Sequence, residues 1–208
     1  MGMKQVFIMQ PNREYIALME GLGFQLCDRV KEANLVVFTG GSDVSPELYG
    51  QHSHPRTHSN FERDMIERQL FQSCREFDIP MLGICRGAQF LNVMSGGSLV
   101  QDVEGHLGNH MATSARGSSY EVTSTHHQMM IPGEGAILEG WATGLGQRKQ
   151  VASEKGGFEI LTNDPIDPEV LYYEDTECLC CQFHPEFVGA HDSRAWLKTC
   201  LELYLDMG

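Results

Sequence analysis

The residues with the clearest chemical potential lie in the stretch Gly83-Ile84-Cys85-Arg86-Gly87, which follows a short apolar run. A nucleophile with glycine two positions away on each side is the pattern of a nucleophile elbow, here with cysteine in place of serine. So sharp a strand-to-helix turn strains the backbone and leaves no room for side chains at the glycine positions. The first turn of the following helix favours a thiolate. We therefore predict that Cys85 is a nucleophile, with its thiol exposed at the carboxyl end of the strand.

A cysteine nucleophile needs a base, and the stretch His184-Pro185-Glu186 offers one together with a carboxylate to orient it. Side chains two residues apart in an extended backbone point the same way. Glu186 can therefore accept a hydrogen bond from one ring nitrogen of His184 and leave the other facing Cys85. A surface turn is the alternative interpretation. The position after an apolar strand, together with the cysteine elbow, favours the catalytic one.

The tetrahedral intermediate of an attack by Cys85 needs amide donors. One is the backbone amide of Arg86, directly after the nucleophile. A second can come from the turn Gly40-Gly41-Ser42, which follows a core strand and so lies at the same edge of the sheet. A strand-to-loop turn that merely uses glycine remains the alternative for this segment.

Short apolar strands alternate with helices along the chain, which predicts an α/β fold with a parallel or mixed sheet. The expected core strands cover residues 5–9, 24–30, 35–39, 79–84 and 177–183. The expected helices cover residues 11–22, 61–77, 86–95 and 193–205. The second of these helices is expected to bury Met65, Ile66, Leu70 and Phe71, and to carry Asp64 and Glu67, near Arg63, as solvated surface charges.

The segment 102–119 is rich in Gly, His, Asn and Ser and is predicted to be a loop. Further short strands are expected at 120–125, 136–141, 150–153 and 158–161. The sequence shows no internal repeat, low-complexity segment or linker. We therefore expect a single domain over residues 1–208.

The composition argues against several classes of function. The formal net charge of -13 disfavours a nucleic-acid surface, which needs basic side chains. No apolar run is long enough to cross a bilayer and no signal peptide is apparent, so no membrane association is expected. The seven cysteines, an odd number without disulfide spacing, are expected to be reduced thiols of a cytoplasmic protein.

Two groups of side chains resemble metal ligands at first sight. The cysteines within 178–181 precede His184, but they lie on a predicted buried strand, where cysteine acts as a small apolar residue. His52, His54 and His58 lie in a polar segment that is expected to be a solvated loop near the site. We expect neither group to bind a metal, and we expect no cofactor.

Taken together, five blocks of the sequence resemble class I glutamine amidotransferases, and more narrowly their γ-glutamyl hydrolase branch, peptidase family C26. The blocks come in the family's order: Gly40-Gly41-Ser42-Asp43-Val44, Gly83-Ile84-Cys85-Arg86-Gly87-Ala88-Gln89, Asn92-Val93 with Gly96-Gly97-Ser98-Leu99 and Gln101-Asp102, Ser124-Thr125-His126-His127-Gln128, and Gln182-Phe183-His184-Pro185-Glu186. The resemblance implies a flavodoxin-like fold with a mostly parallel central sheet, helices on both faces and a small antiparallel β extension.

The resemblance also implies roles for individual residues. These are a catalytic triad of Cys85, His184 and Glu186, an oxyanion hole of the Gly41 and Arg86 amides, and substrate contacts from Gln89 and His126. The implied reaction is hydrolysis of a γ-glutamyl amide bond through a γ-glutamyl thioester, which releases glutamate and either ammonia or an amine. One departure is Thr123, where the branch often carries asparagine.

Three functional alternatives remain open at this point. As a glutamine amidotransferase-type glutaminase, the chain would pass ammonia to a separate synthetase partner. As a free-standing hydrolase, it would act on a small-molecule γ-glutamyl amine or peptide. A non-catalytic regulatory or binding subunit on the same scaffold is the third alternative, which the presence of all three triad residues disfavours.

Overall fold

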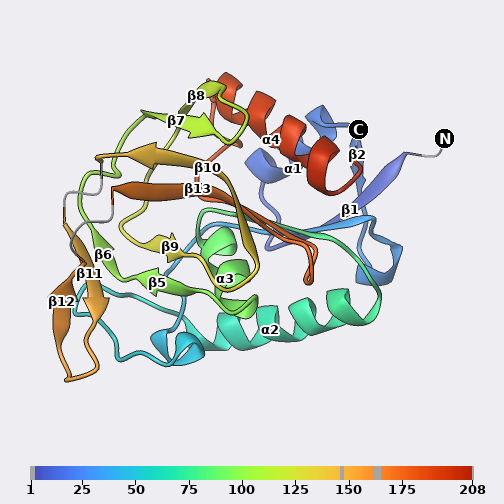
Figure 1. The fold of residues 1–208 in the computed structure, drawn as a ribbon. Coiled ribbons are helices and arrows are strands. Elements are labelled where there is room, and N and C mark those ends of the chain that lie inside the picture. Colours follow the sequence, from blue (N-terminus) through green and yellow to red (C-terminus); the bar gives the residue numbers. More distant parts are fainter. Residues whose placement is uncertain (1–2, 146–147, 162–164, 208) are drawn as a thin grey trace.

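A mixed nine-stranded sheet forms the centre of the computed structural model, which describes residues 3–145, 148–161 and 165–207 (Figure 1). Its parallel part has the order β2-β1-β3-β4-β14, formed by Phe24–Leu26, Lys4–Met9, Leu35–Phe38, Met81–Ile84 and Cys178–Cys181. The sheet continues antiparallel as β13-β10-β7-β8, formed by Ile166–Tyr173, Ala136–Thr143, His110–Ser114 and Ser119–Val122. The predicted α/β class with a parallel core and an antiparallel extension is thereby confirmed.

Four α-helices within the described residues cover both faces of the parallel strands (Figure 1). On one face lie α1 (Arg13–Gly21) and α4 (His191–Tyr204), and on the other α2 (Phe61–Glu76) and α3 (Arg86–Met94). The alternation of side chains along β3 explains this layering, because Leu35 and Val37 belong to one hydrophobic core while Val36 and Phe38 belong to the other. A strand that is buried on both faces is therefore apolar throughout.

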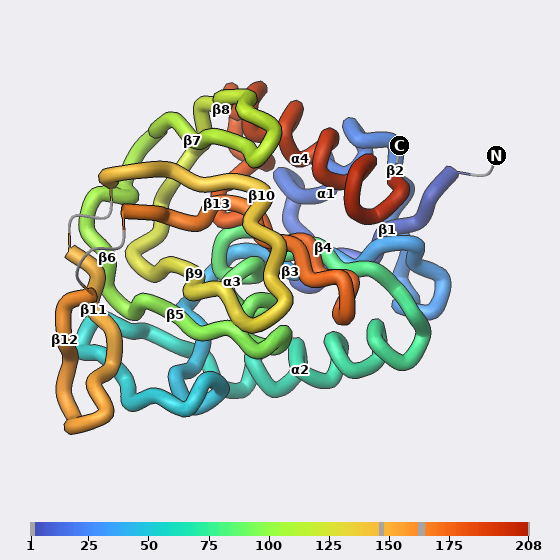
Figure 2. The backbone as a smooth tube through the Cα atoms, viewed as in Figure 1, coloured from blue at the N-terminus to red at the C-terminus, as the bar shows by residue number. Residues whose placement is uncertain are grey.

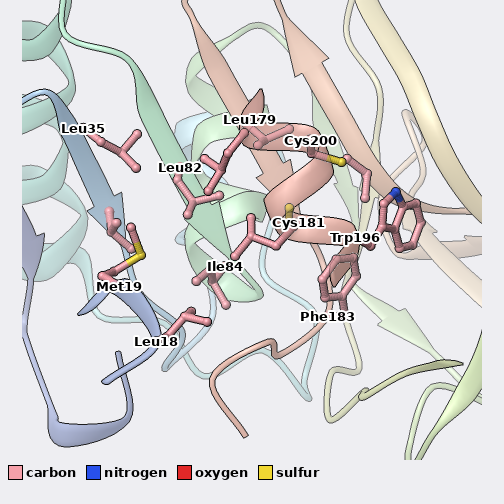
Figure 3. Close-up of a cluster of buried hydrophobic side chains, with 14 of the residues drawn as sticks. Leu18, Met19, Leu35, Leu82, Ile84, Leu179, Cys181, Phe183, Trp196 and Cys200 are labelled. Atoms are coloured by element: carbon pink, nitrogen blue, oxygen red, sulfur yellow. The ribbon is translucent and has the colours of Figure 1, made fainter. Parts of the chain in front are cut away.

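Figure 3 shows the core between the sheet and the pair α1 and α4. Met19 of α1 and Trp196 of α4 are both buried there, together with Leu82 of β4 and Leu179 of β14. This packing holds the central parallel strands in one rigid layer, from which the site described below is built.

Two smaller sheets lie beside the central one. The first consists of β6 (Asp102–Val103), β11 (Lys149–Ala152) and β12 (Phe158–Ile160), and the second of β5 (Ser98–Val100) and β9 (Met129–Ile131). Figure 2 shows the first of them at the edge of the molecule, away from α1 and α4. Short 3-10 helices, η1 and η2, occupy Val30–Glu32 and Pro46–Tyr49. In the described ranges, no helix combines the length and the hydropathy needed to span a membrane.

The predicted loop 102–119 is wrong in part, because it contains β6 and β7 and the first residue of β8. These strands are stabilised by partners far away in the sequence, namely β11 for β6 and β10 for β7, so their own polar composition does not reveal them.

Strand β13 was not expected either. Its apolar pattern is broken by Asp167, Pro168 and Glu169, and its pairing with β10 and β14 decides its conformation.

The predicted surface charges of α2 are also wrong. Arg63, Asp64 and Glu67 have exposed fractions of 7%, 0% and 0%, whereas Ile66, expected in the core, is 49% exposed. The buried face of α2 is rotated away from the apolar stripe because its charged side chains pair with each other and with Arg86. Buried charges are tolerated when they are paired in this way.

The carboxyl ends of three neighbouring strands bring the predicted site residues together. Strand β3 ends two residues before Gly40, β4 ends just before Cys85, and β14 ends three residues before His184. Since β3, β4 and β14 are adjacent and parallel, their carboxyl ends meet at one edge of the sheet. Such an edge is where α/β sheets bind their ligands.

Candidate active site

Cys85 lies in a strained turn, as the elbow pattern predicted. Its φ of 53° and ψ of -110° are unusual for a residue with a side chain. The flanking glycines are required sterically, since a Cβ at Gly83 would lie 2.5 Å from the backbone nitrogen of Ala88, and one at Gly87 would lie 2.0 Å from the carbonyl oxygen of Phe38. The expected exposure of Cys85 is wrong, because only 8% of the residue is exposed. Access to its thiol is through a cavity rather than from the open surface.

His184 and Glu186 form the expected pair. Nδ1 of His184 lies 2.7 Å from Oε1 of Glu186, while Nε2 lies 2.9 Å from the hydroxyl of Thr125. Thr123 donates a hydrogen bond from its hydroxyl to the carbonyl of His184 at 2.7 Å, so this departure from the family pattern fixes the backbone of the histidine. The imidazole also stacks on Phe187, with ring centroids 4.4 Å apart. Three contacts thus hold the ring, and a fourth holds the backbone of His184.

The electrostatic surroundings favour the protonated form of His184. Burial by itself lowers the pKa of His184, but hydrogen bonding and charge interactions with Cys85 and Glu186 outweigh burial and raise this pKa from 6.5 to about 10. His184 is therefore an imidazolium at neutral pH. In that state it can donate a proton to a leaving group.

The two predicted amide donors flank the same cavity as Cys85. Arg86 is the first residue of α3, where backbone amides have no partner within the helix. Gly41 has a φ of 144°, which only glycine adopts readily. The side chain of Arg63 donates to the carbonyl oxygens of Gly40 at 3.1 Å and of Thr39 at 2.9 Å. Because the C=O and N–H of a peptide plane point in opposite directions, Arg63 holds the Gly41 amide facing away from itself.

Tyr15 connects this turn to the histidine pair. Its hydroxyl accepts a hydrogen bond from the Gly40 amide at 2.9 Å. Burial, followed by the nearby charge of Glu186, raises the pKa of Tyr15. The hydroxyl thus stays protonated between the glycine turn and the carboxylate that orients His184.

A cavity of about 420 Å³ joins these groups. Six of the seven predicted site residues line it, namely Gly41, Cys85, Arg86, Gln89, His126 and His184, while Glu186 lies behind His184. The side chain of Gln89 donates to the carbonyl oxygen of Gln128 at 2.9 Å. Burial, followed by the proximity of His106, lowers the pKa of His126 well below 6.5. His126 is therefore neutral at physiological pH.

Sequence reasoning missed three residues that support this site, which are Tyr15, Arg63 and Thr125. Thr125 lies within a block that resembles the family, so its neighbourhood carried a signal. Tyr15 and Arg63 lie on α1 and α2, and their positions show no local pattern that distinguishes them from ordinary helix residues.

The structure places the two groups of side chains that were first considered as metal ligands in different environments. The cysteines of β14 are fully buried, and burial raises the pKa values of their thiols, as befits small core residues. His54 is 8% exposed rather than solvated, and its amide donates to the side chain of Gln101 at 2.9 Å. Within the described part of the chain, His52, His54 and His58 do not gather as a set of metal ligands.

Comparison with protein families matches residues 24–186 to the model described as Peptidase C26. A Mycobacterium tuberculosis protein provisionally named a glutamine amidotransferase is 38% identical over 125 residues, which cover 50% of this chain and 41% of that protein. The γ-glutamyl-γ-aminobutyrate hydrolase of Escherichia coli is 28% identical over 157 residues, which cover 70% of this chain and 61% of that enzyme. The chain thus spans less than two thirds of the length of these curated relatives.

Solved structures share the fold. PurLQS of Thermotoga maritima aligns over 97% of this chain and 99% of that chain, with a TM-score of 0.62 and 14% identity. A glutamine amidotransferase of the same organism aligns over 99% of this chain and 90% of that chain, with a TM-score of 0.59 and 18% identity. The expected amidotransferase-type architecture is therefore confirmed.

Proposed function

The chain belongs to the peptidase C26 family, and from this premise we propose that it hydrolyses a γ-glutamyl amide bond by way of a γ-glutamyl thioester on Cys85. The observation that carries the proposal is the position of His184, whose Nδ1 lies 2.7 Å from Oε1 of Glu186 and which lines the same cavity as Cys85. A base held by a carboxylate beside a nucleophile on a strained elbow is the arrangement that acyl transfer needs.

In the first half-reaction, the sulfur of Cys85 attacks the γ-carbonyl carbon, and the negative charge that develops on the carbonyl oxygen is stabilised by the amides of Gly41 and Arg86. His184 then donates its Nε2 proton to the nitrogen of the leaving group. The carbon–nitrogen bond breaks, ammonia or an amine departs, and the glutamyl group remains as a thioester.

In the second half-reaction, neutral His184 accepts a proton from water, and the resulting hydroxide adds to the thioester carbon. The tetrahedral intermediate uses the same two amides and collapses with breakage of the carbon–sulfur bond. Glutamate leaves, and the proton on His184 restores the starting state. Glu186 keeps its charge throughout and stabilises the imidazolium.

Gln89 and His126 are proposed to form the part of the cavity wall that receives the glutamyl group. Both are buried and both line the cavity beside Cys85. Hydrogen bonds to Gln128 hold both side chains, which keeps the shape of this wall fixed before substrate binds.

The test is to compare wild type with Cys85→Ala for release of glutamate and ammonia from glutamine, and for release of amine from a panel of γ-glutamyl amines. Cys27→Ala is the matched control, since Cys27 is a half-buried cysteine on a different part of the chain. Loss of all activity in Cys85→Ala, with Cys27→Ala unaffected, supports the proposal. Activity retained in Cys85→Ala contradicts it.

The panel also separates the remaining alternatives. Faster turnover of one γ-glutamyl amine than of glutamine identifies a free-standing hydrolase. Glutamine turnover that rises when a synthetase is added identifies a glutaminase subunit with that partner. A non-catalytic subunit would turn over none of these compounds and would not be labelled at Cys85 by a glutamine-analogue electrophile, which mass spectrometry of the digested protein detects.

A further inference from the structure

A group of buried titratable side chains lies beside the candidate active site. His106, His126 and Glu169 come from three separate segments, and one potential ligand atom of each lies within 4.8 Å of the others. Their exposed fractions are 1%, 5% and 0%. The proposed reaction uses neither His106 nor Glu169. So many polar atoms buried in one place need an explanation.

The ring of His126 is oriented as a metal ligand would be. Its Nδ1 lies 2.8 Å from the carbonyl oxygen of Gln128, so this nitrogen carries the proton and donates it to the carbonyl. Its Nε2 then bears a free lone pair, and it has no hydrogen-bond partner among the described residues. A histidine that ligates a metal through one nitrogen almost always donates the other N–H to a carbonyl or carboxylate in this way.

His106 is buried with neither ring nitrogen hydrogen-bonded to any described residue. Its Nε2 lies 3.5 Å from a carboxylate oxygen of Asp167, and its Nδ1 lies 3.9 Å from Oε1 of Glu169. The rings of His106 and His126 are tilted by 33° to each other, with their centroids 4.7 Å apart. The two imidazoles therefore present their nitrogens to one small volume.

Glu169 adds a buried carboxylate with one unsatisfied oxygen to this volume. Its Oε1 accepts a hydrogen bond from Nε2 of His110 at 2.9 Å, whereas its Oε2 is buried with no hydrogen-bond partner in the described ranges. The nearby Lys149 pairs with Asp167 at 2.8 Å, and no described lysine or arginine pairs with Glu169. A buried carboxylate oxygen without a donor is costly, so a cation bound at Oε2 would stabilise the protein.

We propose that His106, His126 and Glu169 bind a divalent transition-metal ion, for which Zn²⁺ is the best fit. Two imidazoles and one carboxylate form a ligand set typical of zinc, with a fourth position left for water. Metal–ligand bonds of this set imply ligand atoms about 3.4 Å apart in a tetrahedral site. The three side chains must therefore move closer together when the ion binds. His110 and Asp167 would orient the ligands from outside.

The ion would also restrain a residue of the candidate active site. The hydroxyl of Ser124 donates to the carbonyl of His106 at 2.6 Å, and Leu107 forms a β-bridge with Thr125. Thr125 in turn contacts His184 at 2.9 Å. An ion that joins His106 to the neighbouring segment therefore restrains the residue that contacts the proposed catalytic histidine.

The experiment measures binding of Zn²⁺ alone by calorimetry and of Co²⁺ alone by visible absorption, using the full chain in a Cys85→Ala background so that the active-site thiol cannot compete. We expect one equivalent of metal and the visible bands of a low-symmetry Co²⁺ site. Adding Glu169→Gln should weaken binding by at least about 100-fold, since a change to an outer partner alone costs 10–100-fold. His191→Gln, which alters an exposed histidine at the start of α4, is the matched control and should change nothing.

Two outcomes overturn the proposal. The first is a Cys85→Ala protein that takes up no stoichiometric metal. The second is metal uptake that is equally tight in the Glu169→Gln protein, since the ion would then lie elsewhere. If Glu169→Gln does not fold, His110→Asn takes its place, with an expected loss of about 10–100-fold in affinity. Because the readout is binding, its failure leaves the proposed hydrolysis untouched.

Discussion

The Arg63→Lys substitution tests whether Arg63 fixes the orientation of the turn Gly40-Gly41-Ser42, which we propose to supply one amide of the oxyanion hole. Arg63 is 7% exposed and donates to Glu67 at 2.8 Å and to the carbonyl oxygens of Thr39 and Gly40 at 2.9 and 3.1 Å. Lysine keeps the positive charge and can keep the contact with Glu67. It lacks the planar fork that reaches two carbonyls at once. The peptide between Gly40 and Gly41 would then be free to rotate.

The expected losses in kcat and in stability follow from these contacts. Outright loss of one oxyanion-hole donor lowers kcat by about 10²–10³-fold, so a donor that is only partly misoriented should lower kcat by about 10–100-fold. Because this donor acts mainly on the transition state, KM should change little. The free energy of unfolding should fall by about 1.5–3 kcal/mol for each lost hydrogen bond to the charged group.

The assay is steady-state release of glutamate from the best substrate of the γ-glutamyl panel, with urea denaturation in parallel. The alkylation rate of Cys85 by iodoacetamide serves as an internal reference, because alkylation needs the thiolate but not the oxyanion hole. Arg68→Lys is the matched control, since Arg68 is exposed on the same helix. A kcat within threefold of wild type for Arg63→Lys, together with a loss of stability, would refute the reasoning and leave Arg63 a purely structural residue.

Three further outcomes are expected. The raised pKa of His184 stabilises the folded protein. This contribution is complete below pH 6.5 and is lost as pH rises through about 10. Urea denaturation from pH 6.5 to 10.5 should therefore show a steeper fall in the free energy of unfolding for wild type than for His184→Gln. Glu186→Gln should lower kcat by up to about 10⁴-fold with little change in KM, because the side-chain amide of glutamine no longer fixes the tautomer of His184. A decrease in kcat of less than tenfold would contradict the proposed triad. Gly87→Ala places a Cβ 2.0 Å from the carbonyl oxygen of Phe38, so it should destabilise the protein by at least about 3 kcal/mol in denaturant titration, whereas Gly21→Ala meets no atom within 4 Å and should not.

The elements that could be predicted from the sequence are those whose physical cause is local. The strand before Cys85, the turn and the helix after it are encoded by an apolar run and two glycines within a few residues. The pairing of His184 with Glu186 was expected from their separation by two residues, and the structure has these side chains 2.7 Å apart, although residues 185 and 186 form a turn and not an extended strand. Such features need no knowledge of distant contacts.

The errors arise where a distant partner decides the outcome. A charged residue on α2 looks solvated in the sequence, but Asp64 and Glu67 are buried because Arg86 of the next helix pairs with both. Strand β7 looks like a polar loop, but it pairs with β8 and β10. Hydrophobic patterning cannot reveal burial that is made favourable by a complementary charge or by a hydrogen-bonded neighbour.

The sequence by itself therefore determined the fold class, the nucleophile elbow and the histidine–glutamate pair, because spacing along one strand or one turn sets their geometry. Only the tertiary structure decided that Arg63 holds the Gly40 carbonyl, and that Thr125 contacts His184. It also decided that His106, His126 and Glu169 converge across three separate segments. Their convergence depends on the register of paired strands and on the packing of helices against the sheet, and these are properties that a linear pattern does not contain.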